Sequence, residues 1–216
     1  MTTWLSRITP AEHRPDVTAD LAEATRLHQR IMTLFPPDLG EHARAQAGIL
    51  FRTDEDATGT SILIQSRIEP NTQRLPEGYG HAQIRTLDPL LDALRAGLPL
   101  RYRITANATR KLGRNTQHGK PLTVVPLHGL DAEAWWARKA VEAGLDPRIV
   151  TAVSLETAQG PRRPGTGSQT QFVRHARTRF DGTATITDPE RLRDALTNGI
   201  GRGKSYGCGL LTIAPA

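Results

Sequence analysis

Residues 187–213 read TDPERLRDALTNGIGRGKSYGCGLLTI, and this stretch decides how the carboxyl half of the chain is organised. Asp188 and Pro189 predict the start of a helix, because aspartate caps the free amides of a first turn and proline is tolerated at the first helical position. An apolar strand is predicted at 209–213. Between the two lies a glycine-rich loop that contains Gly199, Gly201, Gly203, Gly207 and Gly209.

This loop resembles a nucleotide-binding P-loop only superficially. Gly203-Lys204-Ser205 matches the end of that motif, but a P-loop follows a strand and opens a helix, whereas this loop follows a helix and precedes the last strand. Only seven residues remain after Gly209, which is too few for the required helix. The sequence therefore argues against nucleotide hydrolysis. Arg202, Lys204 and Ser205 still predict a phosphate contact, because glycines let backbone amides approach an anion; the alternative is a tight connection without a ligand.

The order of elements around the loop predicts the fold. In the second half of the chain we expect strands and helices in the order βαββαβ, at 120–125, 131–143, 149–155, 171–180, 188–197 and 209–213. The same order is predicted for the first half, at 3–8, 18–34, 48–52, 61–67, 90–96 and 100–106. The sequence therefore predicts an α+β protein with two tandem ferredoxin-like domains, residues 1–107 and 120–216, joined by a basic linker at 108–119.

Composition excludes several other classes of protein. The chain has 216 residues, of which 38% are hydrophobic and 23% charged, as in folded globular proteins. No apolar run approaches the roughly 18 residues of a membrane helix, and no secretory signal is visible. A single cysteine, Cys208, excludes an internal disulfide framework, so we expect a reducing cytoplasm. The seven histidines show no metal-ligand spacing, and we expect neither a metal nor a cofactor.

Positive charge is concentrated in the second half. Residues 1–107 carry 12 basic and 13 acidic side chains, whereas residues 108–216 carry 16 basic and 9 acidic ones. This asymmetry indicates a polyanionic partner that binds mainly to the second half. Besides the loop, the candidate contacts are basic residues of the linker and of the later arginine-rich tract: Arg110, Lys111, Arg114, Arg162, Arg163, Arg174 and Arg177.

His28 is the candidate for proton transfer, because imidazole has a pKa near neutrality. On a helical wheel, however, it lies within the apolar stripe formed by Leu21, Ala24, Ile31 and Phe35. The wheel alone therefore leaves two interpretations open: a histidine of the core, or an acid/base residue that faces a cleft.

Four segments together resemble the CasE subfamily of CRISPR-associated endoribonucleases, which process repeat RNA in the Cascade system. They are Trp4-Leu5-Ser6-Arg7, Leu27-His28-Gln29-Arg30, residues 100–107 (LRYRITAN) and residues 201–211 (GRGKSYGCGLL). The last segment is fairly specific, and the order of all four covers nearly the whole chain.

The resemblance implies metal-independent cleavage of repeat stem-loops in precursor CRISPR RNA. In the family the RNA 2′-hydroxyl attacks the scissile phosphate, which leaves a 2′,3′-cyclic phosphate and a 5′-hydroxyl, and the mature RNA stays bound in a complex with other Cascade subunits. His28 then becomes the acid/base candidate, with Lys204 as an assisting cation. Some members carry a tyrosine at the place of Thr25, so the sequence argues against a tyrosine-dependent mechanism here.

Two other functions remain open. One is a non-catalytic RNA-binding subunit, which the absence of the tyrosine favours and the intact histidine motif disfavours. The other is an enzyme acting on a small phosphate-bearing substrate at the glycine-rich loop, which the extent of the positive charge disfavours.

Overall fold

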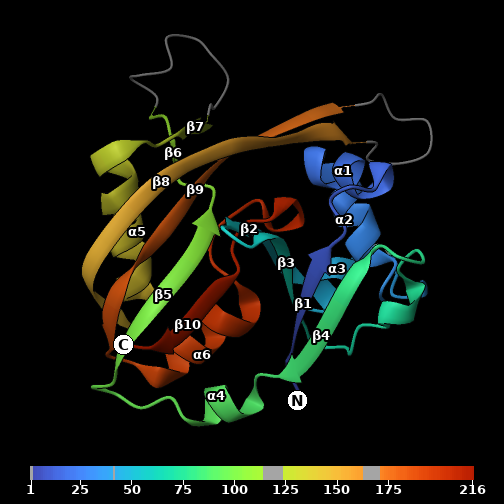
Figure 1. Cartoon of the computed structure of the whole chain (residues 1–216). Helices are drawn as coiled ribbons and strands as arrows, with labels where there is room; N and C mark the ends of the chain where they lie inside the picture. Colours follow the sequence, from blue (N-terminus) through green and yellow to red (C-terminus); the bar gives the residue numbers. More distant parts are fainter. Residues whose placement is uncertain (1, 41, 114–123, 163–170) are drawn as a thin grey trace.

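The computed structural model describes residues 2–40, 42–113, 124–162 and 171–216. Two four-stranded antiparallel sheets dominate it, one from each half of the chain, and helices cover one face of each sheet (Figure 1). Strands β6 (Thr109–Lys111) and β7 (Val124–Pro126) pair with each other in a two-stranded ribbon, which is a third sheet. The α+β, tandem ferredoxin-like prediction is confirmed.

The first sheet has the strand order β2-β3-β1-β4. Its strands are β1 (Trp4–Pro10), β2 (Leu50–Asp56), β3 (Gly59–Ser66) and β4 (Gly80–Thr86). The strands predicted at 48–52 and 61–67 are present and form a hairpin, in which Asp56 pairs with Gly59 across the turn between β2 and β3. The core behind this sheet contains Ile8, Ile31, Phe35, Phe51 and Ile64.

The helix predicted at 18–34 is two helices, α1 (Pro15–Ala22) and α2 (Ala24–Met32), separated by Glu23 in extended conformation. A buried ionic cluster accompanies the break. The Asp20 carboxylate, 3% exposed, accepts hydrogen bonds from Arg30 Nε at 2.6 Å and from the Tyr79 hydroxyl at 3.2 Å. The hydrogen bonds of Asp20 therefore join the two helices to each other and to the loop before β4. A short helix α3 (Ala43–Gln46) follows.

The first unit departs from the predicted βαββαβ order in its second half. The sequence predicts a loop at residues 69–87, but they contain the edge strand β4, preceded only by the short 3₁₀ turn η1 (Thr72–Arg74). A full helix is absent from this described segment, which is consistent with its prolines and glycines at Pro70, Pro76 and Gly78. The helix predicted at 90–96 is the short α4 (Asp88–Asp92), which connects the two sheets.

The second sheet has the strand order β10-β5-β9-β8. Its elements are β5 (Pro99–Ala106), α5 (Gly129–Glu142), β8 (Leu145–Arg162), β9 (Gln171–Ile186), α6 (Pro189–Asn198) and β10 (Leu211–Pro215). The core beneath α5 and α6 is built around Trp136, Phe180 and Leu192. The Asp188 side chain accepts from the amides of Glu190 and Arg191, as predicted for a helix cap.

One strand lies in a different sheet from the one that the sequence predicts. The strand expected at 100–106 belongs, in that prediction, to a first unit that ends at residue 107, but β5 pairs with β9 and β10 of the second sheet. The transition between the sheets therefore falls between Thr86 and Pro99. The strand predicted at 120–125 appears within the described residues as β7, which pairs with β6 instead of with the second sheet. An alternating pattern predicts a strand but not its partner, because the same pattern fits either sheet.

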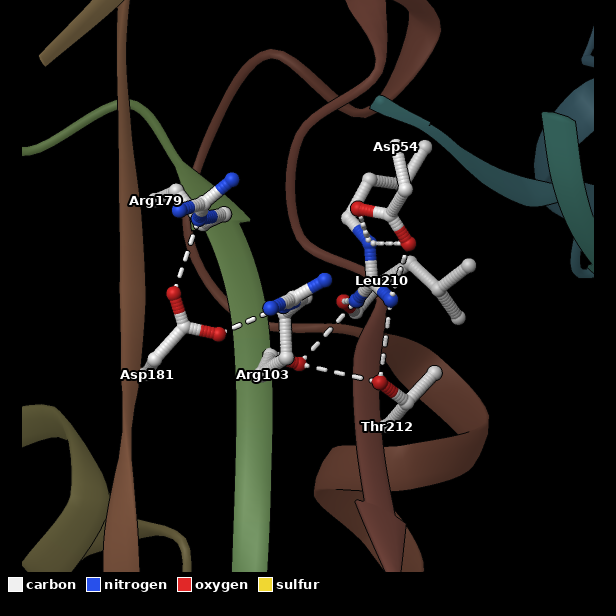
Figure 2. A network of polar contacts seen from close by, with 7 residues as sticks. Asp54, Arg103, Arg179, Asp181, Leu210 and Thr212 are labelled. Carbon is white, nitrogen blue, oxygen red and sulfur yellow. Dashed lines mark hydrogen bonds and ion pairs between the residues drawn. The ribbon is translucent and has the colours of Figure 1, made fainter. Parts of the chain in front are cut away.

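Arg52 joins the two sheets, and Figure 2 labels its partners Asp54, Leu210 and Thr212. This side chain comes from the edge strand β2, is 2% exposed and pairs with Asp54 at 2.8 Å. Its guanidinium also donates to the carbonyl oxygens of Arg103 at 3.0 Å and Leu210 at 3.2 Å, and to the hydroxyl of Thr212 at 3.1 Å. Because the acceptors belong to β5, β10 and the turn before it, this one buried cation fixes the second sheet against the first.

The β8–β9 hairpin is longer than predicted and reaches across to the first unit (Figure 1). Pairing extends to Arg162 opposite Gln171, past a bulge between Leu155 and Ala158. At its far part the hairpin lies against α2, so closely that a Cβ at Gly160 would clash with Oγ1 of Thr25. The hairpin of the second unit thereby covers the helix that carries His28.

Candidate active site

The glycine-rich loop has a defined backbone conformation. Its five glycines have φ angles between +71° and +93°, the left-handed region that other residues rarely adopt. A Cβ at Gly209 would also lie 2.8 Å from the Ile200 carbonyl oxygen. The carbonyl oxygen of Gly203 accepts from the amides of Tyr206 and Cys208, and the Gly209 amide donates to Thr105 of β5. The loop, including its 3₁₀ turn η3 (Lys204–Tyr206), is therefore anchored on the second sheet.

His28 is half-buried on α2 and packs against an aromatic ring. Its imidazole is stacked on Phe51 with 6.2 Å between ring centroids and 18° between planes. Nδ1 is buried and has no hydrogen-bond partner among the described residues. Burial, and secondly the positive charge of Arg44, lowers the pKa of His28 from 6.5 to about 4. The imidazole is therefore neutral at neutral pH.

The structure brings His28 and the glycine-rich loop together. Helix α2 and strand β2 both contact η3. Phe51, which stacks on His28, also comes within 3.4 Å of the Cβ position of Gly207. Arg44 lowers the pKa of Lys204 as well as that of His28, so it lies near both groups. An imidazole from the first unit and a cationic loop from the second thus share one site.

Lys204 is held in place at this site. Its Nζ donates to the Asn198 carbonyl oxygen at 2.7 Å, and burial, with a smaller contribution from Arg44, lowers its pKa. Arg44 donates to the Ile49 carbonyl oxygen at 3.0 Å, and burial lowers its pKa too. The charge of Arg44 therefore acts on Lys204, and both cations are partly removed from water, which disfavours their charges unless an anion binds.

Thr25 is 8% exposed and its hydroxyl donates to the Glu23 carboxylate. With Gly160 of the hairpin packed over it, this side chain belongs to the contact between α2 and β8. Because its hydroxyl is hydrogen-bonded to Glu23 and covered by Gly160, Thr25 is not placed to act as a second proton-transfer group beside His28.

A cavity of about 100 Å³ lies beside this contact, between α1, α2, the β2–β3 hairpin and β8. Arg177, one of the predicted RNA contacts, lines it together with Tyr206, and Arg177 Nε donates to the Glu156 carbonyl oxygen at 2.8 Å. Arg177 therefore lies at the junction of the two units.

The remaining predicted contacts fall into three groups. Arg174 and Arg202 are exposed and line one groove, while Ser205 is half-buried in η3. Arg110 and Lys111 are exposed on β6. Arg114, Arg163 and the side chain of Arg162 lie outside the described residues.

Sequence reasoning missed four side chains of this region: Arg44, Phe51, His175 and Tyr206. Phe51 reads as an ordinary core residue, and Arg44 lies in a segment without a recognisable pattern. His175 and Tyr206 are 31 residues apart in the sequence, yet the distance between their ring centroids is 4.7 Å. The one signal in the sequence is that Tyr206 lies within the glycine-rich motif at residues 201–211.

Within the described part of the chain, no group of three or more histidine, cysteine, aspartate or glutamate side chains is placed to hold a metal ion. None of the helices described there is long and apolar enough to cross a membrane.

Comparisons with known proteins assign the chain to a family. Residues 3–215 match the family described as CRISPR associated protein. The CRISPR-associated endoribonuclease Cse3 of Thermus thermophilus is 29% identical over 229 residues, 98% of this chain and 100% of that protein. The structure of Cse3 bound to an RNA representing a pre-cleavage complex has a TM-score of 0.79 at 25% identity and covers 100% of both chains.

Two further relatives agree. The Cascade subunit CasE of Escherichia coli is 30% identical over 201 residues, 88% of this chain and 91% of that protein. A chain of a CRISPR RNA-guided surveillance complex, in a pre-nicking structure, is 38% identical with a TM-score of 0.75 over 99% of this chain and 100% of that chain. With a full-length family match and a fold that joins the histidine helix to the glycine-rich loop, the chain belongs to the CRISPR-associated protein family and is an endoribonuclease of that family.

Proposed function

We propose that this protein cleaves CRISPR repeat stem-loops in precursor RNA without a metal ion, and that it retains the mature RNA as a subunit of Cascade. The observation that carries the proposal is the position of His28 beside the glycine-rich loop and its cations. Relatives that are named an endoribonuclease and a Cascade subunit, one of them with bound RNA, support the choice of substrate and partners.

The proposed chemistry uses the ribose of the RNA itself. The His28 imidazole, neutral at neutral pH, removes the proton from the 2′-hydroxyl. The 2′-oxygen forms a bond to the scissile phosphorus while the bond to the 5′-oxygen breaks, which gives a 2′,3′-cyclic phosphate. The leaving oxygen then takes a proton from the imidazolium or from water, which restores the balance and gives a 5′-hydroxyl. No step of this reaction requires a metal ion.

Lys204 and Arg44 stabilise the phosphate in this scheme. Negative charge increases on the phosphate oxygens in the transition state, and fixed cations in a partly dehydrated site stabilise it there more effectively than water does. The same phosphate charge raises the pKa of His28 when RNA binds, because an anion close to an imidazole favours its protonated form. A pKa raised toward neutrality makes His28 a more effective acid/base group than it is in the free protein.

The second unit supplies most of the proposed RNA binding. The hairpin and the β6–β7 ribbon carry exposed basic side chains, namely Arg174 on β9 and Arg110 and Lys111 on β6. Duplex RNA is recognised mainly through its shape and phosphates, for which such a surface is suited.

A non-catalytic RNA-binding subunit is the second candidate function. It is favoured by the low pKa of His28 and by the engaged hydroxyl of Thr25, which leave one weakly basic group at the site. In that case RNA would bind the protein and remain intact.

Incubation of repeat RNA with the protein in EDTA tests the proposal. We expect one cut per repeat with a cyclic phosphate end, and no cut when a 2′-deoxy nucleotide replaces the nucleotide that supplies the attacking hydroxyl. Binding without cleavage at any metal concentration would favour the second function. Cleavage that stops in EDTA and returns with Mg²⁺ would contradict the metal-independent mechanism.

A further inference from the structure

A groove of about 440 Å³ runs between the β6–β7 ribbon and the β8–β9 hairpin. It is separate from the cavity between the two units, although Thr157 contributes to both. Its described lining contains Arg174, His175 and Arg202 but no acidic side chain. The groove is therefore suited to an anionic ligand.

The groove also has an aromatic wall. His175 is half-buried. Its ring centroid lies 4.7 Å from that of Tyr206, and the two ring planes are inclined by 30°. Burial, and secondly the charge of Arg202, lowers the pKa of His175, so its ring is neutral near neutral pH. A neutral planar ring backed by a second ring offers a surface on which a nucleobase can stack.

The glycine-rich loop connects this groove to the candidate active site. Arg202 lines the groove and influences His175, whereas Lys204, two residues later, lies near Arg44 at the site of His28. An RNA strand that crosses the loop would thus meet a cation on each side of it.

We propose that this groove binds one unpaired nucleotide of the RNA strand cut at His28, with its base against His175 and its phosphates at Arg174 and Arg202. The inference rests on the proposed function. An unpaired nucleotide suits the groove better than the stem does, because a duplex hides its base faces within the helix and presents phosphates and groove edges. The volume of the groove also falls in the range of pockets that hold one small ligand.

The test compares two RNAs that share one repeat stem. One ends at the stem, the other continues with an unpaired flank, and both carry a 2′-deoxy nucleotide at the mapped cleavage position. We expect the flank to strengthen binding to the wild-type protein about tenfold, which is a typical contribution of one stacked base. His175→Ala should abolish that gain and leave binding of the blunt stem unchanged.

Three further variants sharpen the result. His175→Phe should restore the gain, because phenylalanine keeps a stacking surface without the imidazole nitrogens. Arg202→Ala should reduce the gain and lower the salt slope for the flanked RNA by about 0.7, the value for one phosphate contact in a single strand. Arg148→Ala removes the same charge from an exposed position paired with Asp146, and should change neither RNA's binding.

Equal loss of binding for both RNAs would assign the groove to the stem and overturn the proposal. A gain that survives His175→Ala, or that His175→Phe fails to restore, would overturn it as well. If the wild-type protein neither binds nor cuts repeat RNA, the proposed function fails independently. Binding of a short oligouridine then decides the groove alone: affinity that depends on His175 and Arg202 supports it, and its absence contradicts it.

Discussion

The two ferredoxin-like units have the same strand order but differ in what they contribute. The first, with 10 basic and 13 acidic residues up to position 98, carries His28 on a short helix beside a core aromatic ring. The second, from position 99 on, has 18 basic and 9 acidic residues and carries the glycine-rich loop and the long hairpin. In the proposed function, the proton-transfer group therefore belongs to one unit and most of the RNA-binding surface to the other. The candidate site lies where the two units meet.

The largest expected effect tests that separation directly. His28→Gln should lower the rate of cleavage by about 10²–10⁴-fold, because that is what a positioned acid/base group contributes, and should leave affinity for repeat RNA within about twofold. Single-turnover cleavage and binding of uncleavable RNA measure the two quantities. An equal loss of cleavage rate and RNA affinity would mean that His28 has a structural role. The two units would then not divide catalysis and binding between them.

The second largest effect is expected at the contact between the two units, where Arg52 lies. Arg52→Met leaves Asp54 and three acceptors of the second unit without their partner, and it should lower the free energy of unfolding by about 3–5 kcal/mol. Arg67→Ala is a matched control, because this arginine also reaches the second unit, at Asn198, but through an exposed hydrogen bond. It should cost less than about 1 kcal/mol in urea unfolding. Similar losses for the two variants would mean that Arg52 does not hold the units together.

Acid should destabilise the first unit through His28. The pKa of His28 is about 4 in the folded protein and about 6.5 in the unfolded chain, so between these values the unfolded chain binds a proton that the folded protein does not. The contribution of the neutral His28 to the free energy of unfolding is fully present above pH 6.5 and is lost as the pH falls toward 4. Allowing for its partial exposure, the loss due to His28 is about 2–3 kcal/mol.

Urea unfolding of the wild type and of His28→Gln at pH 7 and about pH 4.5 measures this loss, since the variant keeps every other titrating group. The wild type should lose more stability than the variant between the two pH values. A wild type that loses no more than His28→Gln would show that the imidazole is freely protonated in the folded protein.

The smallest effect tests binding by the second unit. Arg110→Ala combined with Lys111→Ala should weaken binding of repeat RNA and lower the salt slope by about one for each phosphate that these side chains neutralise, with the cleavage rate at saturation unchanged. Arg138→Ala combined with Lys139→Ala removes the same two charges from α5, where both pair with Glu142, and serves as the control. Identical salt slopes for the two double variants would exclude the β6–β7 ribbon from the interface.

Local signals were sufficient for much of the molecule. The cap at Asp188, the two strands at 48–52 and 61–67 and the alternation at 100–106 each predict an element that the structure contains, because caps, turns and period-two patterns act over a few residues. The motif at 201–211 and the motif around His28 likewise indicate the family from the sequence alone. The hairpin strands are longer than the sequence predicts, because Gly160 and Pro161 are residues typical of loops.

The sequence by itself therefore determined the types of element, the family and the two motifs of the candidate site. Only the tertiary structure decided that β5 pairs in the second sheet and that β4 forms an edge of the first sheet. It also decided that Arg52 joins the two sheets. It also places His28 half-buried against Phe51 and beside the loop that carries Lys204, a position that the helical wheel does not give. The reason is physical. Strand partners and contacts between units depend on groups far apart in the chain, and no local pattern records which distant surface will bury a given face.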